Sequence, residues 1–406
     1  MGCVVQGQVG QVTGRILKIG LLWHSSKSGN LGVGALTIAN MAIARQVAEE
    51  LGLEPRFTII GVADKGRAYV SLDEASLYEV NSRRLLDPRE LMSVIGAQNC
   101  LLDIGAGDSF ADIYGFKRFF FLWWSKAMAV VRGVPLILSP QTIGPFTRQP
   151  YRSMGRWAME RADGVVARDH ESFDILKRLA PRARAVQSVD VAFALPFEDR
   201  SGERGGARLR VGVNVSGLLL NEAEGGRNRF GLQVDYSALM RRFVAALVAR
   251  EDVEVHLISH ATSLQDSGDD DGQAADRFAA EFPGAIRVPD FAGPCEAKSY
   301  ISSLDYLVAG RMHACIAAYS SGTPVVPVAY SRKFSGLFGT LGYDFLLPVK
   351  GRATEDALQT LIGGLERRQE MKAAITKGME KIETLLESYR NELRVQFAVA
   401  GELAAI

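Results

Sequence analysis

The chain alternates between short apolar segments and longer segments with helical periodicity, and this alternation runs through it twice. Apolar segments that predict buried strands in the first half are 16–23, 56–62, 100–104, 134–138 and 164–167. After an interruption, similar segments return at 209–215, 253–258, 304–309 and 324–329. Helical stretches such as 36–51 and 237–250 separate most of them. Strands that alternate with helices predict parallel sheets with helices packed on both faces.

The interruption between the two halves, from Pro196 to Arg208, is polar and rich in glycine, as linkers are. We therefore expect an N-terminal domain over 1–196, a linker over 197–208 and a C-terminal domain over 209–406. The predicted fold class is α/β, with two Rossmann-like domains that face a cleft in a GT-B-type architecture. The stretch from Thr354 onward permits helix and contains no proline. We expect its helices to pack back across the domain junction.

Charge and cysteine usage narrow the functional classes. The 406 residues include 47 Lys and Arg against 46 Asp and Glu, a net charge of +1. This balance argues against bulk nucleic-acid binding, which requires a strongly basic surface. The cysteines, Cys3, Cys100, Cys295 and Cys315, lack metal-ligand spacing and are typical of a reduced, cytoplasmic protein. No signal peptide precedes the first strand, which also favours a cytoplasmic location, and no metal site is expected.

The charged residues most indicative of a site follow strands of the second half. The strand 304–309 leads into Arg311 and His313, and the strand 324–329 leads into Lys333. The carboxyl ends of parallel strands form the ligand-binding edge of an open sheet. Cations at helix N-termini bind anions, so the segment predicts an anion site. The alternative is that Arg311 and His313 cap the helix and form local ion pairs.

Two further residues are expected at the same cleft. Arg168 follows the strand 164–167, although an ion pair with the neighbouring Asp169 or Glu171 is an alternative role for it. His260 ends another strand and can line the cleft.

Two glycine-containing turns follow strands of the first half. Asn30 and Gly32 lie in the first turn, and Gly105, Gly107 and Asp108 lie in the second. A dinucleotide fingerprint would need a third glycine, which the first turn lacks. The turns are therefore either plain tight turns or loops that shape a ligand pocket, with Asp108 as a base.

Three segments have open interpretations. The polar loops 220–233 and 261–272 are long enough to be lids or mobile surface, and the acidic run Asp269–Asp271 is expected to be a solvated loop. The aromatic segment 118–132 is too short and too charged to span a bilayer. A buried core helix is favoured for it. An interfacial helix that contacts a membrane through Phe119–Trp124 is the alternative.

The Arg-x-His motif at Arg311, followed by a Gly-x-Pro strand and Lys333, resembles the polysaccharide pyruvyltransferase family. Further segments that fit the same family in order and spacing are Asn30–Gly32, Gly105–Gly107, Gln141–Pro145, Ala167–Asp169 with Ser172, and Val189–Phe193. The chain departs from the family pattern at Val33, where an acidic residue is common. It departs again at Ala106 and Asp108, in a loop that commonly has three glycines. Both departures lie in the half expected to hold the acceptor.

The resemblance implies a phosphoenolpyruvate-dependent transferase of exopolysaccharide synthesis, which adds pyruvate as a cyclic ketal to a sugar. Its partners would be phosphoenolpyruvate and a sugar or lipid-linked oligosaccharide acceptor, without a cofactor. Such a small trianion suits arginine forks. We assign donor binding to Arg168, Arg311 and Lys333, with Arg332 as the competitor of Lys333. Residues assigned to catalysis are His313 (general acid or phosphate partner), Arg311 and Asp108. Residues assigned to acceptor binding are Asn30, Gly32, Gly105, Gly107 and His260.

Two other functions remain open. A nucleotide-sugar glycosyltransferase can have the same architecture, but it usually has a carboxylate for the ribose in the C-terminal half. The equivalent stretch here, 324–338, contains Lys333 and no acid. A non-catalytic binding protein on the same fold is the second alternative, and the presence of both Arg311 and His313 speaks against it.

Overall fold

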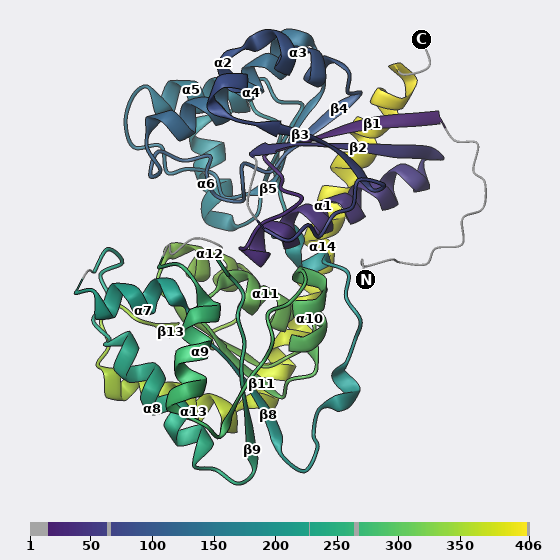
Figure 1. Cartoon of the computed structure of the whole chain (residues 1–406). Helices are drawn as coiled ribbons and strands as arrows, with labels where there is room; N and C mark the ends of the chain where they lie inside the picture. Colours follow the sequence, from purple (N-terminus) through teal and green to yellow (C-terminus); the bar gives the residue numbers. More distant parts are fainter. Residues whose placement is uncertain (1–14, 63–65, 227, 264–267, 404–406) are drawn as a thin grey trace.

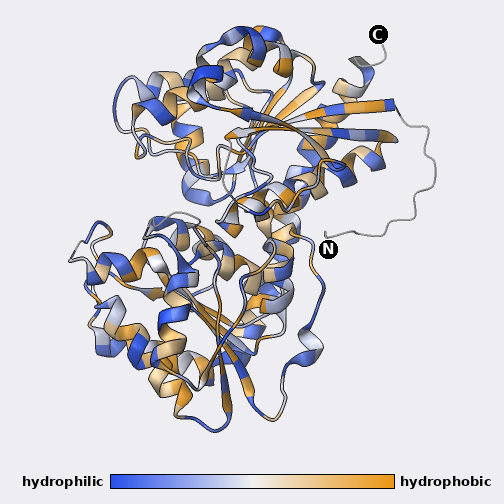
Figure 2. Cartoon of the chain, in the orientation of Figure 1, coloured by the Kyte–Doolittle hydropathy of each residue, from blue (hydrophilic) through white to orange (hydrophobic). Residues whose placement is uncertain are grey.

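The computed structural model describes residues 15–62, 66–226, 228–263 and 268–403, so Cys3 lies outside the described residues. The chain forms two α/β domains, one above the other in Figure 1, each built on a parallel sheet. In Figure 2 the strands of both sheets are mainly hydrophobic, whereas the loops and the outer faces of the helices are mainly hydrophilic. This distribution is typical of doubly wound sheets that are covered on both faces.

The first domain has a seven-stranded sheet in the order β3-β2-β1-β4-β5-β6-β7, in which every neighbouring pair is parallel. Its strands are β1 (Arg15–Leu22), β2 (Leu53–Val62), β3 (Ala75–Val80), β4 (Cys100–Asp103), β5 (Leu136–Gln141), β6 (Gly164–Ala167) and β7 (Ala185–Gln187). Its helices are α1 (Leu31–Glu50), α2 (Ser82–Leu86), α3 (Pro88–Gly96), α4 (Phe116–Arg132), α5 (Tyr151–Met159) and α6 (His170–Leu179). All the strands therefore end at one edge of the sheet.

The second domain has a six-stranded parallel sheet in the order β10-β9-β8-β11-β12-β13. Its strands are β8 (Leu209–Asn214), β9 (Val253–Leu257), β10 (Ala285–Arg287), β11 (Tyr306–Ala309), β12 (Val325–Ala329) and β13 (Leu347–Pro348). Its helices are α7 (Gly217–Glu224), α8 (Tyr236–Val248), α9 (Asp271–Glu281), α10 (Pro294–Ser302), α11 (Met312–Ser320), α12 (Arg332–Leu341) and α13 (Thr354–Glu366). The short helices η1 (Val191–Ala194) and η2 (Ser201–Glu203) lie between the domains in sequence.

The segment predicted as a linker is fixed to the second domain rather than free. Arg204 donates hydrogen bonds to the carbonyl oxygens of Ser302, Ser321 and Gly322 at 2.7, 2.9 and 2.9 Å. An arginine that satisfies three carbonyl groups at once holds this segment against α10 and the end of α11.

The last helix, α14 (Arg368–Leu403), connects both domains. It contacts α11, α12 and α13 in the second domain and α1, β1 and β7 in the first, and Figure 1 shows it running from one domain into the other. Tyr389, Leu393 and Phe397 on this helix are each 0% exposed. The chain thus completes the core of its first domain with its last helix.

Helix α1 is the one helix, among the residues that the structure describes, that is long and apolar enough to cross a membrane. Of its most apolar stretch, 72% is buried inside the protein. It packs against α14 and, in the second domain, against α10 and α11, as a core helix does.

Several elements differ from the sequence-based expectation. The strands β3, β7, β10 and β13 were not predicted, and all four lie at the edges or near the ends of the sheets. The predicted loop 220–233 begins inside α7, whose N-cap is Ser216. The predicted loop 261–272 runs into α9, whose N-cap is Asp270. Residues 227 and 264–267 of these loops lie outside the described part of the chain.

Candidate functional site

The carboxyl edges of the two sheets face each other across a cavity of about 150 Å³. Residues from the first domain that line it include Asn30, Gly107, Asp108 and Arg168, and residues from the second domain include His260, Arg311, His313 and Lys333. These eight residues were all predicted from the sequence. Gly32 and Gly105, the other two predicted residues, are not among the residues that line the cavity. Each supports a side chain, as described below.

His313 lies in the first turn of α11, directly against α1 of the other domain. A Cβ atom on Gly32 would lie 2.3 Å from the Nδ1 atom of His313, so only glycine allows this approach. The Nε2 atom lies 3.8 Å from the carboxylate of Asp190 and has no hydrogen-bond partner among the described residues. The side chain keeps 19% of its surface exposed. The Nε2 atom is itself buried, so it is a polar atom without a hydrogen bond to the described residues, on a side chain that lines the cavity.

The protonation of His313 is set by opposing effects. Burial lowers the pKa of its imidazole, the carboxylates of Asp190 and Asp108 raise it, and the cations Arg168 and Lys333 lower it. The net pKa lies below the usual value for histidine. The imidazole is therefore mainly neutral at pH 7, and an anion bound beside it would favour the protonated form.

Arg168 forms a buried ion pair with Asp190. Its Nη1 atom donates to Asp190 at 2.6 Å, and both side chains are almost fully buried. The alternative partners considered from the sequence, Asp169 and Glu171, are wrong. Asp169 instead caps α6 by accepting from the backbone N–H of Ser172 at 2.7 Å, and Glu171 lies 3.4 Å from Arg332 at the edge of the cleft.

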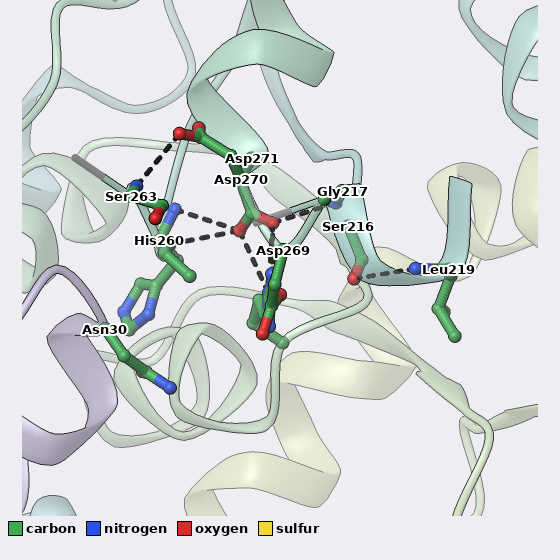
Figure 3. A network of polar contacts seen from close by, with 12 residues as sticks. Asn30, Ser216, Gly217, Leu219, His260, Ser263, Asp269, Asp270 and Asp271 are labelled. Atoms are coloured by element: carbon green, nitrogen blue, oxygen red, sulfur yellow. Dashed lines mark hydrogen bonds and ion pairs between the residues drawn. The ribbon is translucent and has the colours of Figure 1, made fainter. Parts of the chain in front are cut away.

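Arg311 is held by the acidic run that precedes α9. Its Nη2 and Nε atoms donate to Asp271 at 2.7 and 3.0 Å, and Nη2 also pairs with Asp269. Asp271 is 0% exposed and accepts from the backbone N–H groups of Gly217 and His260 at 2.9 and 3.2 Å (Figure 3). Arg311 therefore enters the cavity from a fixed position.

The prediction of a solvated acidic loop at Asp269–Asp271 is consequently wrong. Asp270 is the N-cap of α9 and Asp271 is its first residue, and acids are favoured at helix N-termini. Burial raises the pKa of Asp271, but Arg311 and the neighbouring N–H groups lower it more, so its pKa is below the usual value. The run of three carboxylates in the sequence did not by itself indicate an ion pair with the buried Arg311.

Lys333 and Asp108 form an ion pair across the cavity, between α12 and the glycine loop of the first domain. The hydroxyl of Tyr114 donates to the same carboxylate at 2.7 Å. Burial raises the pKa of Asp108, whereas Lys333 and Tyr114 lower it, and the net pKa is below the usual value. Asp108 is thus a carboxylate engaged by Lys333 and Tyr114.

The glycine loop owes its shape to three successive residues with positive φ, namely Gly105 at 53°, Ala106 at 50° and Gly107 at 84°. The Gln141–Pro145 segment supports it, because the N–H of Thr142 donates to the carbonyl oxygen of Gly107 at 2.9 Å. A Cβ atom on Gly105 would meet the side-chain oxygen of Gln141 at 2.1 Å. Gly105 and Gly107 therefore shape the loop that presents Asp108.

The turn at Asn30 joins the two domains. The Asn30 side chain caps α1 by accepting from the N–H of Gly32 at 3.0 Å, and its backbone forms a β-bridge with Ala261. The N–H of Leu31 donates to the carbonyl oxygen of His260 at 3.1 Å. Burial and the neighbouring His313 lower the pKa of His260 to about 3, so its imidazole is neutral.

The sequence reasoning missed three residues of the site. Asp190 lies within the Val189–Phe193 segment that supported the family resemblance, and this was the only signal for it. Asp271 and Tyr114 gave no signal, because their roles depend on partners that are distant in sequence. Among the residues that the structure describes, no three His, Cys, Asp or Glu side chains form a group that could hold a metal ion.

Comparisons with known proteins agree with this fold and with the family that the sequence resembles. A family model for polysaccharide pyruvyl transferase matches residues 30–332, which include every predicted site residue except Lys333. The amylovoran biosynthesis protein AmsJ from Erwinia amylovora is 19% identical over 296 residues, which cover 70% of this chain and 69% of AmsJ.

Solved structures with a similar fold include Anabaena HepE in complex with UDP-glucose, with a TM-score of 0.56 and 13% identity, covering 96% of this chain and 100% of HepE. They also include MnaA from S. aureus with UDP, with a TM-score of 0.54 and 11% identity, covering 89% of this chain and 91% of MnaA. At such identities the likeness concerns the fold, and it confirms the predicted GT-B-type architecture. The family model spans well over half of the chain. The chain therefore belongs to the polysaccharide pyruvyl transferase family.

Proposed function

We propose that this transferase takes its pyruvyl group from phosphoenolpyruvate and attaches it, as a cyclic ketal, to two hydroxyls of a sugar in a polysaccharide or its lipid-linked precursor. The observation that carries the proposal is the convergence of Arg168, Arg311, Lys333 and His313 on one small cavity between the domains. Three cations and an imidazole suit a ligand that has a phosphate and a carboxylate on adjacent atoms.

The ion pairs of the cavity support an exchange of partners on donor binding. Arg168 is paired with Asp190 and Lys333 with Asp108, while Arg311 is held from behind by Asp271. A trianion would compete with Asp190 and Asp108 for the two cations that face the cavity. Binding the donor would thereby release the Asp108 carboxylate, which could then accept a proton from an acceptor hydroxyl.

In the proposed reaction, protonated His313 gives its proton to the methylene carbon of phosphoenolpyruvate, so that the central carbon becomes electrophilic. A sugar hydroxyl oxygen adds to that carbon as its proton passes to Asp108. Phosphate then leaves with the electrons of its C–O bond, and the second hydroxyl adds to complete the ketal. One hydroxyl proton replaces the proton spent by His313, and the other is released with phosphate. Arg168, Arg311 and Lys333 would stabilise the leaving phosphate.

A nucleotide-sugar glycosyltransferase is the second candidate, because HepE and MnaA were solved with UDP-glucose and UDP. Two features of this chain favour the smaller donor. The cavity, at about 150 Å³, is small compared with the ~300–1,000 Å³ of pockets for drug-sized ligands. The segment 324–338 presents Lys333 and no carboxylate for ribose hydroxyls.

Ligand-dependent stability distinguishes the two candidates. Phosphoenolpyruvate should raise the melting temperature, since a ligand at a hundredfold excess over its Kd stabilises the folded state by about 2.7 kcal/mol. UDP-sugars should leave it unchanged. Phosphate release from phosphoenolpyruvate should then require a sugar acceptor and be lost in His313→Ala. Arg242→Gln is the matched control, because Arg242 is an exposed cation of α8 that pairs with Glu355 and is not among the residues that line the cavity. If a UDP-sugar raised the melting temperature and phosphoenolpyruvate did not, the result would contradict the proposal and support the glycosyltransferase.

A further inference from the structure

The surface beside the cavity combines exposed apolar side chains with unpaired cations. We propose that this surface, which we call the α4–α5 patch, docks the protein onto an anionic phospholipid membrane. The patch consists of Ile113, Tyr114 and Phe116 before and at the start of α4, together with the cations Lys117, Arg148 and Arg152. The proposal does not depend on the identity of the donor, because membrane binding is measured without turnover.

The apolar part of the patch is exposed rather than packed. Ile113, Tyr114 and Phe116 are 58%, 40% and 47% exposed. By contrast, Phe119 and Leu122 of the aromatic stretch singled out from the sequence are buried in the first domain. Phe120, Phe121, Trp123 and Trp124 of the same stretch are half-buried. The most exposed apolar side chains thus precede the Phe119–Trp124 stretch, whose half-buried aromatics lie next to them in sequence. Aromatic and aliphatic residues at such positions suit the depth of lipid headgroups.

Three exposed cations lie near these apolar residues in sequence or through Tyr151. Phe116 packs edge-on against Tyr151 of α5, with ring centroids 5.8 Å apart, and Arg148 lies 5.6 Å from the centre of that same ring. Lys117, Arg148 and Arg152 are exposed, and none forms an ion pair within the described part of the chain. Exposed cations beside apolar side chains complement anionic headgroups, each cation adding to the attraction.

The patch is directly continuous with the cavity. Tyr114 belongs to the patch, yet its hydroxyl donates to Asp108 at 2.7 Å. The neighbouring Arg118 stacks on the Tyr114 ring at 5.0 Å and donates to Ser109 at 2.6 Å. A membrane at this surface would therefore lie next to the loop that presents Asp108. An acceptor sugar attached to a lipid could reach the cavity while its lipid stays in the bilayer.

The test is binding of the full chain to vesicles of phosphatidylcholine with and without phosphatidylglycerol, measured by co-sedimentation. We expect binding to the anionic vesicles only, weakened by salt. Ile113→Ser with Phe116→Ser, and separately Lys117→Gln with Arg148→Gln and Arg152→Gln, should each weaken it by about tenfold or more. Val395→Ser with Val399→Ser is the matched control, because these residues of α14 are 46% and 49% exposed and lie outside the patch.

Phosphate release with a soluble acceptor gives a second measurement, since neither set of substitutions alters a residue of the cavity lining. It should be unchanged, whereas release with a lipid-linked acceptor in vesicles should fall. Vesicle binding that is equal in the patch and control variants would overturn the proposal. So would a chain that forms a dimer in solution and becomes monomeric in Ile113→Ser with Phe116→Ser, because a second copy would then cover the patch.

Discussion

His313 illustrates how a residue can be prepared for proton transfer without being protonated in advance. Burial is the main effect that lowers the pKa of its imidazole, with Arg168 and Lys333 acting in the same direction, and the carboxylate of Asp190 is the largest effect that raises it. Asp190 comes from the first domain and His313 from the second, so the contact exists only when the two domains meet. While Arg168 is paired with Asp190, it offsets part of the effect by which Asp190 raises the pKa of His313. A donor that draws Arg168 away from Asp190 would increase the effect of Asp190 on the pKa of His313.

This arrangement predicts a change in the pH dependence of Asp190→Asn. Asp190 raises the pKa of His313, so removing its charge should lower that pKa. If His313 acts as an acid, activity is present below its pKa and lost above it. The limb of the kcat/KM profile that falls with rising pH should therefore move to lower pH, by about one unit or more. Activity near neutral pH should drop and recover partly on acidification.

The controls for this experiment separate positioning from general damage. Glu171→Gln removes a carboxylate that pairs with Arg332 at the edge of the cleft, outside the cavity lining, and should leave the limb in place. His313→Ala should abolish the limb. If kcat/KM of Asp190→Asn is reduced equally at every pH, Asp190 holds Arg168 in place but does not alter the pKa of His313.

At the scale of elements, the sequence pattern predicted where the central strands end. It did not predict which carboxylates pair with the cations that follow those strands. Arg168, Arg311 and Lys333 could be placed because parallel strands deliver their carboxyl ends to one edge. Their carboxylate partners could not be assigned, since each is distant in sequence. Asp190 pairs with Arg168 and Asp271 with Arg311, each within one domain. Asp108 pairs with Lys333 across the cleft, and Asp190 also faces His313 across it. Contacts between domains leave no periodicity in the sequence.

The edge strands were missed for a different reason. Strands β7, β10 and β13 contain only three, three and two residues, which is too short for apolar alternation to be recognised. The stretch after Thr354 was correctly predicted to be helical. Its division into α13 and a 36-residue α14 was not predicted, because no proline marks the boundary.

Two adjacent glycines in α13 provide a test of how closely this helix packs on the sheet that carries Arg311. A Cβ atom on Gly363 would have no neighbour within 4 Å, whereas one on Gly364 would lie 2.3 Å from the hydroxyl of Tyr306, which is fully buried in β11. Gly363→Ala should therefore stabilise the protein by about 0.5–1 kcal/mol through helix propensity. Gly364→Ala should destabilise it, because overpacking costs about 1–3 kcal/mol.

Chemical denaturation followed by circular dichroism measures both variants on the same scale. Equal stabilisation of the two would mean that Tyr306 moves aside without cost. The hydrogen bond from Tyr306 to the carbonyl oxygen of Leu361, at 2.9 Å, argues that it does not.

At the scale of the whole molecule, the site exists because the two domains are joined at several places. The N–H of Thr262 donates to the carbonyl oxygen of Gly29 at 2.8 Å, and Arg332 donates to the carbonyl oxygen of Gly144 at 2.8 Å. Helix α14 adds a covalent connection, since it leaves the second domain and fills the core of the first. A sheet that lacks its covering helix would expose a large apolar surface to water.

The anchor of α14 is Tyr389, whose hydroxyl donates to Asn40 at 2.8 Å and lies 2.9 Å from the Ser139 hydroxyl. Tyr389→Phe would remove the donor to the Oδ1 atom of Asn40, which costs about 1–3 kcal/mol. The Ser139 hydroxyl would still accept from the Nδ2 group of Asn40 at 3.1 Å. Tyr319→Phe is the matched control, because the Tyr319 hydroxyl is also buried but has no hydrogen-bond partner among the described residues. This change should be neutral or slightly stabilising.

Unfolding can be followed separately in the two domains. The four tryptophans, Trp23, Trp123, Trp124 and Trp157, all lie in the first domain, so their fluorescence reports on that domain, whereas far-ultraviolet circular dichroism reports on both. Because α14 belongs to both cores, the two transitions should coincide in the unaltered chain, and Tyr389→Phe should lower both together. A fluorescence transition that moves alone would show that the first domain unfolds independently, and the cavity between the domains would then open before the second domain is lost.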